Sequence, residues 1–242
     1  MSLSQVVSLT PKSSPDAGSI SPGPISLGEM VRLATIPAAD LLAETRSALL
    51  LVDVQNRFIY GASEEKPAPS VRILEPVKRL LTAARANDVT RVFVTVGHPK
   101  GSDSAPWMRR LASMGSDVKR RLDGPLPPWA NEIPAAIAPQ PGEVHLMKCR
   151  FSAFYETGLE LVLRGSGIET VVIGGVASYG CIIATFIDAC SRGFFPLLCA
   201  DAVDGLEPTQ HRAAMDFMSP NSTLKVGPLQ HVEVNASAIS AA

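Results

Sequence analysis

No stretch of apolar residues in this 242-residue sequence approaches the roughly 20 that a helix needs to span a bilayer. The first residues also lack the basic segment and the long apolar segment of a secretory signal. Neither sign of charge is in excess, because 22 Lys and Arg residues against 23 Asp and Glu residues give a formal net charge of −1. No overall basic field therefore favours nucleic acid or an anionic membrane. We expect a cytoplasmic protein that binds neither.

Cysteine is scarce as well. The four cysteines form no C-x-x-C pair and all lie in the C-terminal half, at Cys149, Cys181, Cys190 and Cys199. This pattern excludes a disulfide scaffold and a dithiol redox motif, and no glycine loop of a phosphate-binding type accompanies it. We expect about three of the four to be small buried apolar residues, which leaves one for chemistry.

The two ends of the chain differ in composition from its centre. Residues 1–28 are rich in Ser, Pro and Gly and show no apolar period, so we predict a disordered or arm-like segment. Residues 29–234 have the length and apolar content of one α/β domain, in which the apolar residues of 30–43 are suited to packing on a neighbour. Residues 235–242 are predicted to be a flexible tail.

Within the domain, short apolar runs alternate with stretches of helical period. Strands are predicted over 48–54, 91–97, 143–148, 170–175 and 195–200, and helices over 71–87, 156–164, 181–192 and 208–218. The strand at 48–54 is apolar throughout until it reaches an acid, as expected of a strand buried on both faces. The alternation predicts a three-layer α-β-α fold with a mostly parallel central sheet, of the Rossmann-like kind.

Residues 99–141 interrupt this alternation with many prolines and both tryptophans. We predict an excursion over the edge of the sheet, with a short helix near 106–114. It also carries a basic cluster, for which a solvated surface is the favoured interpretation: Arg109, Arg110, Lys119, Arg120 and Arg121.

Three polar residues follow predicted strands and so reach the same edge of the sheet. Asp53 ends the first strand, Lys148 ends the third, and Cys181 begins a helix after the fourth. A helix N-terminus lowers the pKa of a cysteine thiol, and an acid and a base at buried strand ends relieve one another. Taken singly, each has a structural alternative: a capping acid, an exposed strand end or a core cysteine. Together they supply a nucleophile, a proton acceptor and a cation.

Three blocks of sequence carry a family resemblance. LLLVDVQNRF (49–58), MKCRFSAFYETGLELVLRGSGIETVVIGG (147–175) and GGVASYGCIIATFIDACSRGFFPLLCADAVDG (174–205) resemble the corresponding blocks of isochorismatase-like cysteine hydrolases. The resemblance extends over 43–218 and is weakest over 99–141. It implies that Asp53, Lys148 and Cys181 are the catalytic residues.

The resemblance also implies a mechanism. Cys181 attacks the carbonyl carbon of a small amide, ureide or carbamoyl compound, and Asp53 accepts and then returns the proton, with Lys148 as its ionic partner. A thioester forms and is hydrolysed. The implied oxyanion hole consists of the backbone N–H groups of Ala177 and Cys181, with a cis peptide bond between Val176 and Ala177.

Departures from relatives narrow the implied chemistry. Nicotinamidases carry an Asp-x-His pair in a metal site, whereas here Val96 replaces the acid and only His98 remains. We therefore predict no metal and no cofactor, with a structural role for His98 in its loop. True isochorismatases cleave a vinyl ether without a cysteine nucleophile, so Cys181 favours C–N cleavage. Ile183 stands where maleamate and N-carbamoylsarcosine relatives often carry an Arg for a substrate carboxylate.

The predicted pocket wall follows from the same comparison. Its residues are Phe58, Tyr179, Trp107, Arg150 and Ile182. For Phe58 the alternative is a structural place, packed beneath the excursion. Arg150 lies in a run of residues that resembles the corresponding run of ureidoacrylate amidohydrolases. Gln55 and Asn56 are expected to hold the turn after Asp53 through backbone bonds.

Two functional alternatives remain at the level of sequence: a catalytically idle binding or scaffold protein of the same fold, and an isochorismatase-type ether hydrolase. The predicted partner is a small-molecule substrate. The resemblance further implies a homo-oligomer, either a dimer or a tetramer.

Overall fold

A computed structural model describes residues 45–61, 68–99, 101, 103–113 and 127–221. The predicted arm over 1–28, the apolar stretch over 30–43 and the tail over 235–242 lie outside these residues. The limits 29 and 234 of the predicted domain lie outside them too, as do Lys119, Arg120 and Arg121 of the basic cluster. Within the described ranges, no helix has the length and hydropathy needed to cross a membrane.

The centre of the molecule is a five-stranded sheet in which every pair of neighbouring strands is parallel. Its strands follow the predicted ones, and their order is β3-β2-β1-β4-β5. Their bounds are β1 (Ser47–Val52), β2 (Thr90–Val96), β3 (Val144–Lys148), β4 (Thr170–Val176) and β5 (Phe195–Asp204). The predicted α/β class and parallel sheet are confirmed.

Strand β5 is longer than predicted. The sequence suggested an end at Ala200, because Asp201 breaks the apolar run. In the structure Asp201 is exposed, while Ala202 and Val203 return to the core and the strand continues to Asp204. A single outward-facing acid therefore did not end the strand.

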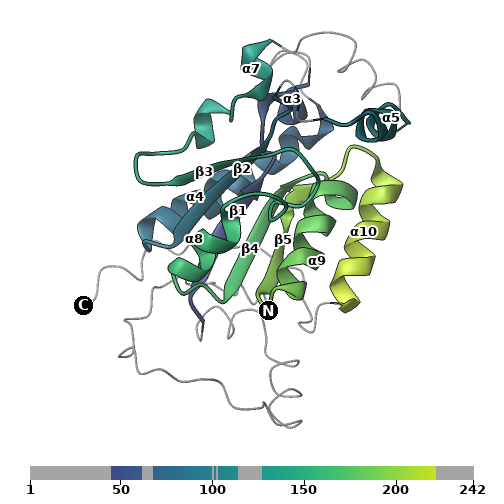
Figure 1. Ribbon diagram of the computed structural model, residues 1–242. Coiled ribbons are helices and arrows are strands. Elements are labelled where there is room, and N and C mark those ends of the chain that lie inside the picture. Colours follow the sequence, from purple (N-terminus) through teal and green to yellow (C-terminus); the bar gives the residue numbers. More distant parts are fainter. Residues whose placement is uncertain (1–44, 62–67, 100, 102, 114–126, 222–242) are drawn as a thin grey trace, which may run out of the picture.

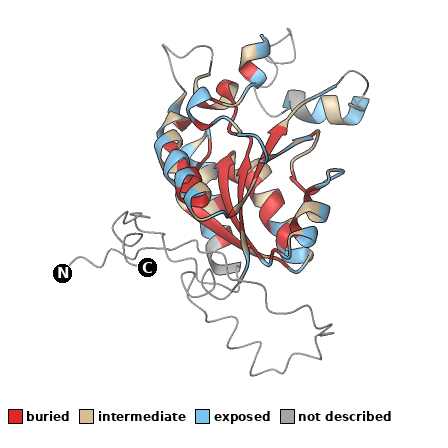
Figure 2. Cartoon of the chain, turned by 90° about the vertical axis from the view of Figure 1, so that its left-hand side faces the viewer, coloured by how far each residue is buried: buried red, intermediate tan, exposed pale blue. Residues whose placement is uncertain are grey.

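Helices cover both faces of the sheet (Figure 1). Alternate residues of β1 divide between the two cores: Leu50 packs with α8 (Leu159–Gly165), α9 (Ile183–Ser191) and α10 (Pro208–Asn221), and Leu49 packs with α4 (Leu74–Ala86). A 3-10 turn over Pro69–Ile73 precedes α4. Because both faces of the sheet are covered, every residue of β1 after Ser47 is buried, and the central strands are largely red in Figure 2.

Short helices follow the carboxyl ends of β1 and β2. They are α3 (Asn56–Ile59), α5 (Ala105–Ser113) and α7 (Pro128–Asn131), with a 3-10 turn over Ala135–Ile137. The helix predicted near 106–114 is confirmed as α5. Arg109 and Arg110 of this helix are exposed, in agreement with a solvated basic face. Figure 1 shows α3, α5 and α7 at one end of the molecule.

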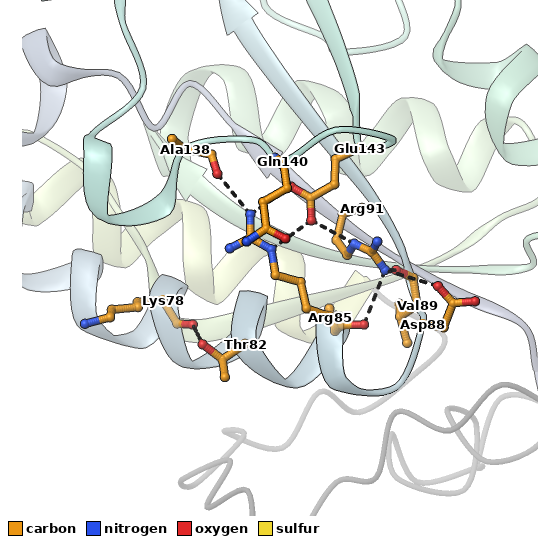
Figure 3. A network of polar contacts seen from close by, with 10 residues as sticks. Lys78, Thr82, Arg85, Asp88, Val89, Arg91, Ala138, Gln140 and Glu143 are labelled. Atoms are coloured by element: carbon orange, nitrogen blue, oxygen red, sulfur yellow. Dashed lines mark hydrogen bonds and ion pairs between the residues drawn. The ribbon is translucent and has the colours of Figure 1, made fainter.

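An ion network fastens the edge strand β3 to helix α4 (Figure 3). The carboxylate of Glu143 has only 1% of its side chain exposed and accepts two bonds of 2.8 Å from Arg85 and one of 3.0 Å from Arg91. The backbone N–H of Gln140 donates a further bond of 2.7 Å. The hydrogen bonds from Arg85 are the main reason that the pKa of Glu143 falls to about 2.

Replacing Glu143 with glutamine should lower the free energy of unfolding by about 2 kcal/mol near neutral pH, because two half-buried guanidinium groups lose their charged partner. The folded-state pKa of Glu143 lies below its ordinary value of 4.5. Its stabilising effect is therefore complete above that value and is lost as the pH falls toward about 2. Urea unfolding of wild type and variant at several pH values measures this difference. Glu75→Gln, on the exposed side of α4, is the matched control, and an equal loss in both variants would contradict the prediction.

Candidate active site

The carboxylate of Asp53 lies directly after β1 in a left-handed backbone conformation. Its φ is 56°, a region that aspartate tolerates better than most residues. The backbone N–H of Asp53 donates to the carbonyl of Val94 over 2.7 Å, and its carbonyl accepts from the N–H of Gln55 over 2.8 Å. The residue is only 1% exposed, so the chain holds a carboxylate at the end of a buried strand.

Lys148 reaches Asp53 from the end of β3, across the intervening strand β2. Its Nζ lies 2.8 Å from Asp53 Oδ2, 3.2 Å from Cys181 Sγ and 3.0 Å from the carbonyl oxygen of Arg150. The side chain has no exposed surface. An ammonium group has three donors, and these three acceptors match them. The structure thus brings together the three residues that the sequence singled out.

Cys181 lies on the helical segment that follows β4. The peptide bond between Val176 and Ala177 is cis, as the resemblance implied. A π-helical turn over Ser178–Ile182 comes next and continues into α9. The helical segment therefore begins at Ser178, three residues before Cys181, and not at Cys181 itself as the sequence predicted.

The thiol pKa differs from the prediction. The position near a helix N-terminus suggested a lowered pKa, whereas burial, and then the charge of Asp53, raise the pKa of Cys181 to about 12 against the opposing effect of Lys148. The pKa of Asp53 is also raised, because burial outweighs the influence of Lys148. At neutral pH the proton therefore rests on sulfur, and Asp53 is a stronger base than an exposed aspartate.

The pKa of the Lys148 ammonium group is raised as well. Burial alone would lower it, but the negative charge of Asp53, the hydrogen bonds from Lys148 to Asp53 and Cys181, and the charge of Cys181 once it loses its proton together outweigh burial. The ammonium group therefore keeps its proton and supplies a fixed positive charge beside the thiol and the carboxylate.

Gln55 and Asn56 hold the loop after Asp53 by bonds to backbone groups, but these groups are far along the chain. The side chain of Gln55 accepts from Val96 N over 3.0 Å and donates to Asn131 O over 2.8 Å. The side chain of Asn56 donates to Trp129 O over 2.9 Å. Both residues are buried. They therefore join the loop after Asp53 to β2 and to the excursion over 99–141, whereas the sequence suggested local bonds within the turn.

The predicted pocket residues divide into two groups. Phe58, Tyr179 and Trp107 are half-buried, and Phe58 packs against the apolar core on the α4 side of the sheet. Ile182 is fully buried in the core on the α8, α9 and α10 side. Its prediction as a pocket residue is wrong, because the helical turn directs it into the sheet rather than toward the edge.

Arg150 belongs to a cluster that includes a residue the sequence did not single out. Asp103 lies 3.0 Å from Nη1 of Arg150 and 2.9 Å from Nδ1 of His98. The guanidinium of Arg150 also covers the Trp107 ring at 4.6 Å, and Trp107 meets the edge of Phe151 with ring centroids 5.2 Å apart. These contacts attach α5 to the segment after β3 and give His98 a structural contact. Across the described ranges, no group of three or more His, Cys, Asp or Glu side chains is arranged to hold a metal ion.

The sequence is similar to known proteins over most of its described residues. The isochorismatase domain model matches residues 47–228. Ureidoacrylate amidohydrolase RutB of Methylorubrum extorquens is 28% identical over 179 residues, which cover 67% of this chain and 71% of the relative. Maleamate amidohydrolase of Pseudomonas putida is 29% identical over 170 residues, which cover 69% and 76%.

Solved structures show the same fold. N-carbamoylsarcosine amidase from Thermoplasma acidophilum matches with a TM-score of 0.59 and 25% identity over 78% of this chain and 99% of that one. An isochorismatase family protein from Desulfovibrio vulgaris matches with a TM-score of 0.62 and 26% identity over 73% and 90%. The domain model alone spans well over half of the sequence. This chain belongs to the isochorismatase family.

Proposed function

We propose that this protein is a cysteine-dependent hydrolase that cleaves a C–N bond in a small amide, ureide or carbamoyl compound through a thioester. The observation that carries the proposal is the contact of Lys148 Nζ with both Asp53, at 2.8 Å, and Cys181, at 3.2 Å. The relatives named as ureidoacrylate and maleamate amidohydrolases support the reaction class.

The raised thiol pKa supports a particular order for the proposed first step. Because the proton rests on Cys181 at neutral pH, Asp53 accepts it as Sγ attacks the carbonyl carbon, and a free thiolate does not accumulate beforehand. The tetrahedral intermediate then collapses, the C–N bond breaks, and Asp53 gives the proton to the departing nitrogen. Lys148 remains protonated throughout and balances the negative charge that moves between carboxylate and sulfur.

Water completes the cycle. It attacks the thioester carbon, Asp53 accepts its proton, and the C–S bond breaks so that the thiol is restored. Nucleophile, base and cation all come from this chain, so the proposed reaction needs no metal or cofactor. The backbone N–H groups of Ala177 and Cys181 are the proposed donors to the carbonyl oxygen as it gains negative charge.

The proposed substrate wall consists of Phe58, Tyr179, Trp107 and Arg150. Arg150 is engaged with Asp103, so a substrate carboxylate at Arg150 would share the guanidinium with an acid of the protein. The homo-oligomeric state and the cytoplasmic location stay predictions from the sequence.

Ammonia release from a panel of small amides, ureides and carbamoyl compounds tests the proposal. We expect release by wild type and a loss of about 1,000-fold or more in Cys181→Ala, because removing a nucleophile leaves only binding and electrostatic effects. Cys190→Ala, which alters an exposed cysteine, is the matched control and should keep full activity.

Two outcomes would contradict the proposal. Activity in Cys181→Ala equal to that of wild type would exclude the thioester route. Absence of release by wild type on every compound, together with an unreactive Cys181, would favour a binding protein of the same fold.

A further inference from the structure

The turn that carries Cys181 is tied to helix α10 by a side-chain hydrogen bond. Ser178 is fully buried, and its Oγ lies 2.9 Å from Nδ1 of His211. His211 comes from the first turns of α10 and is half-buried. Ser178 directly follows Ala177, so the bond acts one residue away from a proposed oxyanion donor.

The connection between β5 and α10 also lies against this turn. A Cβ atom added to Gly205 would lie 2.7 Å from Ser178 Oγ and 2.9 Å from the ring of Tyr179. Only a glycine therefore allows the backbone to approach so closely. The bond to His211 and the close approach of Gly205 therefore both constrain the turn that carries Cys181.

Bonds inside the turn fix its shape but not its position. The carbonyl of Ala177 accepts from Gly180 N over 2.9 Å and from Ile182 N over 3.2 Å. Further along, the hydroxyl of Thr185 donates to the carbonyl of Cys181 over 2.6 Å. Of these contacts, the Ser178–His211 bond is the one that joins the turn to α10.

We propose that His211 is a positioning residue, which acts through Ser178 to aim the N–H groups of Ala177 and Cys181 at the substrate's carbonyl oxygen. This role rests on the proposed hydrolase function. Donors of this kind act only when they meet the oxygen at the distance it reaches in the transition state. A small displacement of the turn therefore weakens the donors without moving the sulfur out of reach of Asp53.

Steady-state kinetics of ammonia release test the role. His211→Ala should lower kcat by roughly 10- to 100-fold with little change in KM, because a misplacement on the order of 1 Å costs about 100-fold. His211→Asn should restore most of the rate, since the amide of asparagine reaches the place of Nδ1. Arg212→Ala, at the exposed next position of α10, should behave as wild type.

Alkylation of Cys181 by iodoacetamide separates positioning from general damage. In that reaction the C–S bond forms, the C–I bond breaks with iodide leaving, and the thiol proton passes to Asp53. No carbonyl oxygen gains charge. The rate at Cys181, followed by mass spectrometry of its peptide, should therefore be the same in wild type and His211→Ala, while kcat falls.

If His211→Ala does not fold, a second variant tests the same hydrogen bond. Ser178→Ala removes the same bond from the other side and should show the same fall in kcat, and the double variant should show no additional loss. An unchanged kcat in either single variant, or a fall in alkylation that matches the fall in kcat, would overturn the positioning role alone. A wild type that releases no ammonia from any compound and whose Cys181 does not react with iodoacetamide would instead overturn the proposed function, and the positioning role with it.

Discussion

Replacing Lys148 with methionine should abolish ammonia release and lower the free energy of unfolding by about 3–5 kcal/mol near neutral pH. The reason is the pairing at 2.8 Å between Lys148 and Asp53, with both side chains almost without exposed surface. Without the ammonium group, the folded state holds a buried carboxylate with no compensating charge. Urea unfolding and ammonia release measure the two effects on the same preparations.

The loss of stability should depend on pH with a definite sign. The pKa of Asp53 is already raised by burial, and removal of Lys148 raises it further. A carboxyl group with a raised folded-state pKa favours folding below its ordinary pKa of 3.8 and disfavours folding as the pH rises through the folded-state value. The destabilisation by Lys148→Met should therefore be smallest in acid and grow toward neutral pH.

Two further variants isolate the charge. Lys78→Met, on the exposed face of α4, is the matched control and should leave stability and activity unchanged. Asp53→Asn combined with Lys148→Met removes both charges and should regain most of the stability but none of the activity. If the double variant is as unstable as Lys148→Met, the loss arises from packing and not from an unpaired carboxylate.

The positions of the proposed catalytic residues are predictable from the sequence because of where they stand on strands. Asp53 follows the buried strand β1, Lys148 is the buried last residue of the edge strand β3, and in a parallel sheet such ends share one edge. The structure places them 2.8 Å apart although 95 positions separate them in the sequence. Local pattern and sheet topology therefore predict that these groups meet, whereas the roles proposed for them rest on the family resemblance.

The environment of these residues is less predictable, because it depends on contacts between distant segments. The local helix suggested a lowered pKa for Cys181, but burial and Asp53 raise it to about 12. Asp103 stands in a polar loop, and only the folded chain shows that Arg150 and His98 meet it. Likewise His211 belongs to an ordinary helical pattern, and its bond to Ser178 spans 33 positions.

The proposed reaction assigns an order to the events at this site. With the proton on the thiol at rest, the proposed role of Lys148 is to balance the charge of the carboxylate and of the developing thiolate during proton transfer. The pH dependence of the rate should then reflect Asp53 on the acid side, above the ordinary range of an aspartate.

The same edge depends on a glycine whose replacement should be among the most damaging in the chain. Gly175 has a φ of 127°, and a Cβ atom there would lie 1.9 Å from the carbonyl oxygen of Val52. Gly175 pairs with Val52 in the register of β1 and β4, directly before Asp53 and the turn that carries Cys181. Gly175→Ala should therefore lower the free energy of unfolding by more than about 4 kcal/mol, and the protein that still folds should be inactive.

Two other glycines separate the causes of this loss. Gly193 has a φ of 78° with open space around an added Cβ, so Gly193→Ala tests backbone strain alone and should cost about 1 kcal/mol. Gly158 has a φ of −79° and also has open space, so Gly158→Ala should stay within about 0.5 kcal/mol of wild type. Urea unfolding of the three variants compares them directly. A loss in Gly175→Ala no greater than in Gly193→Ala would mean that β1 and β4 can separate at this point without cost, and that the close approach of the two strands does not hold Asp53 in place.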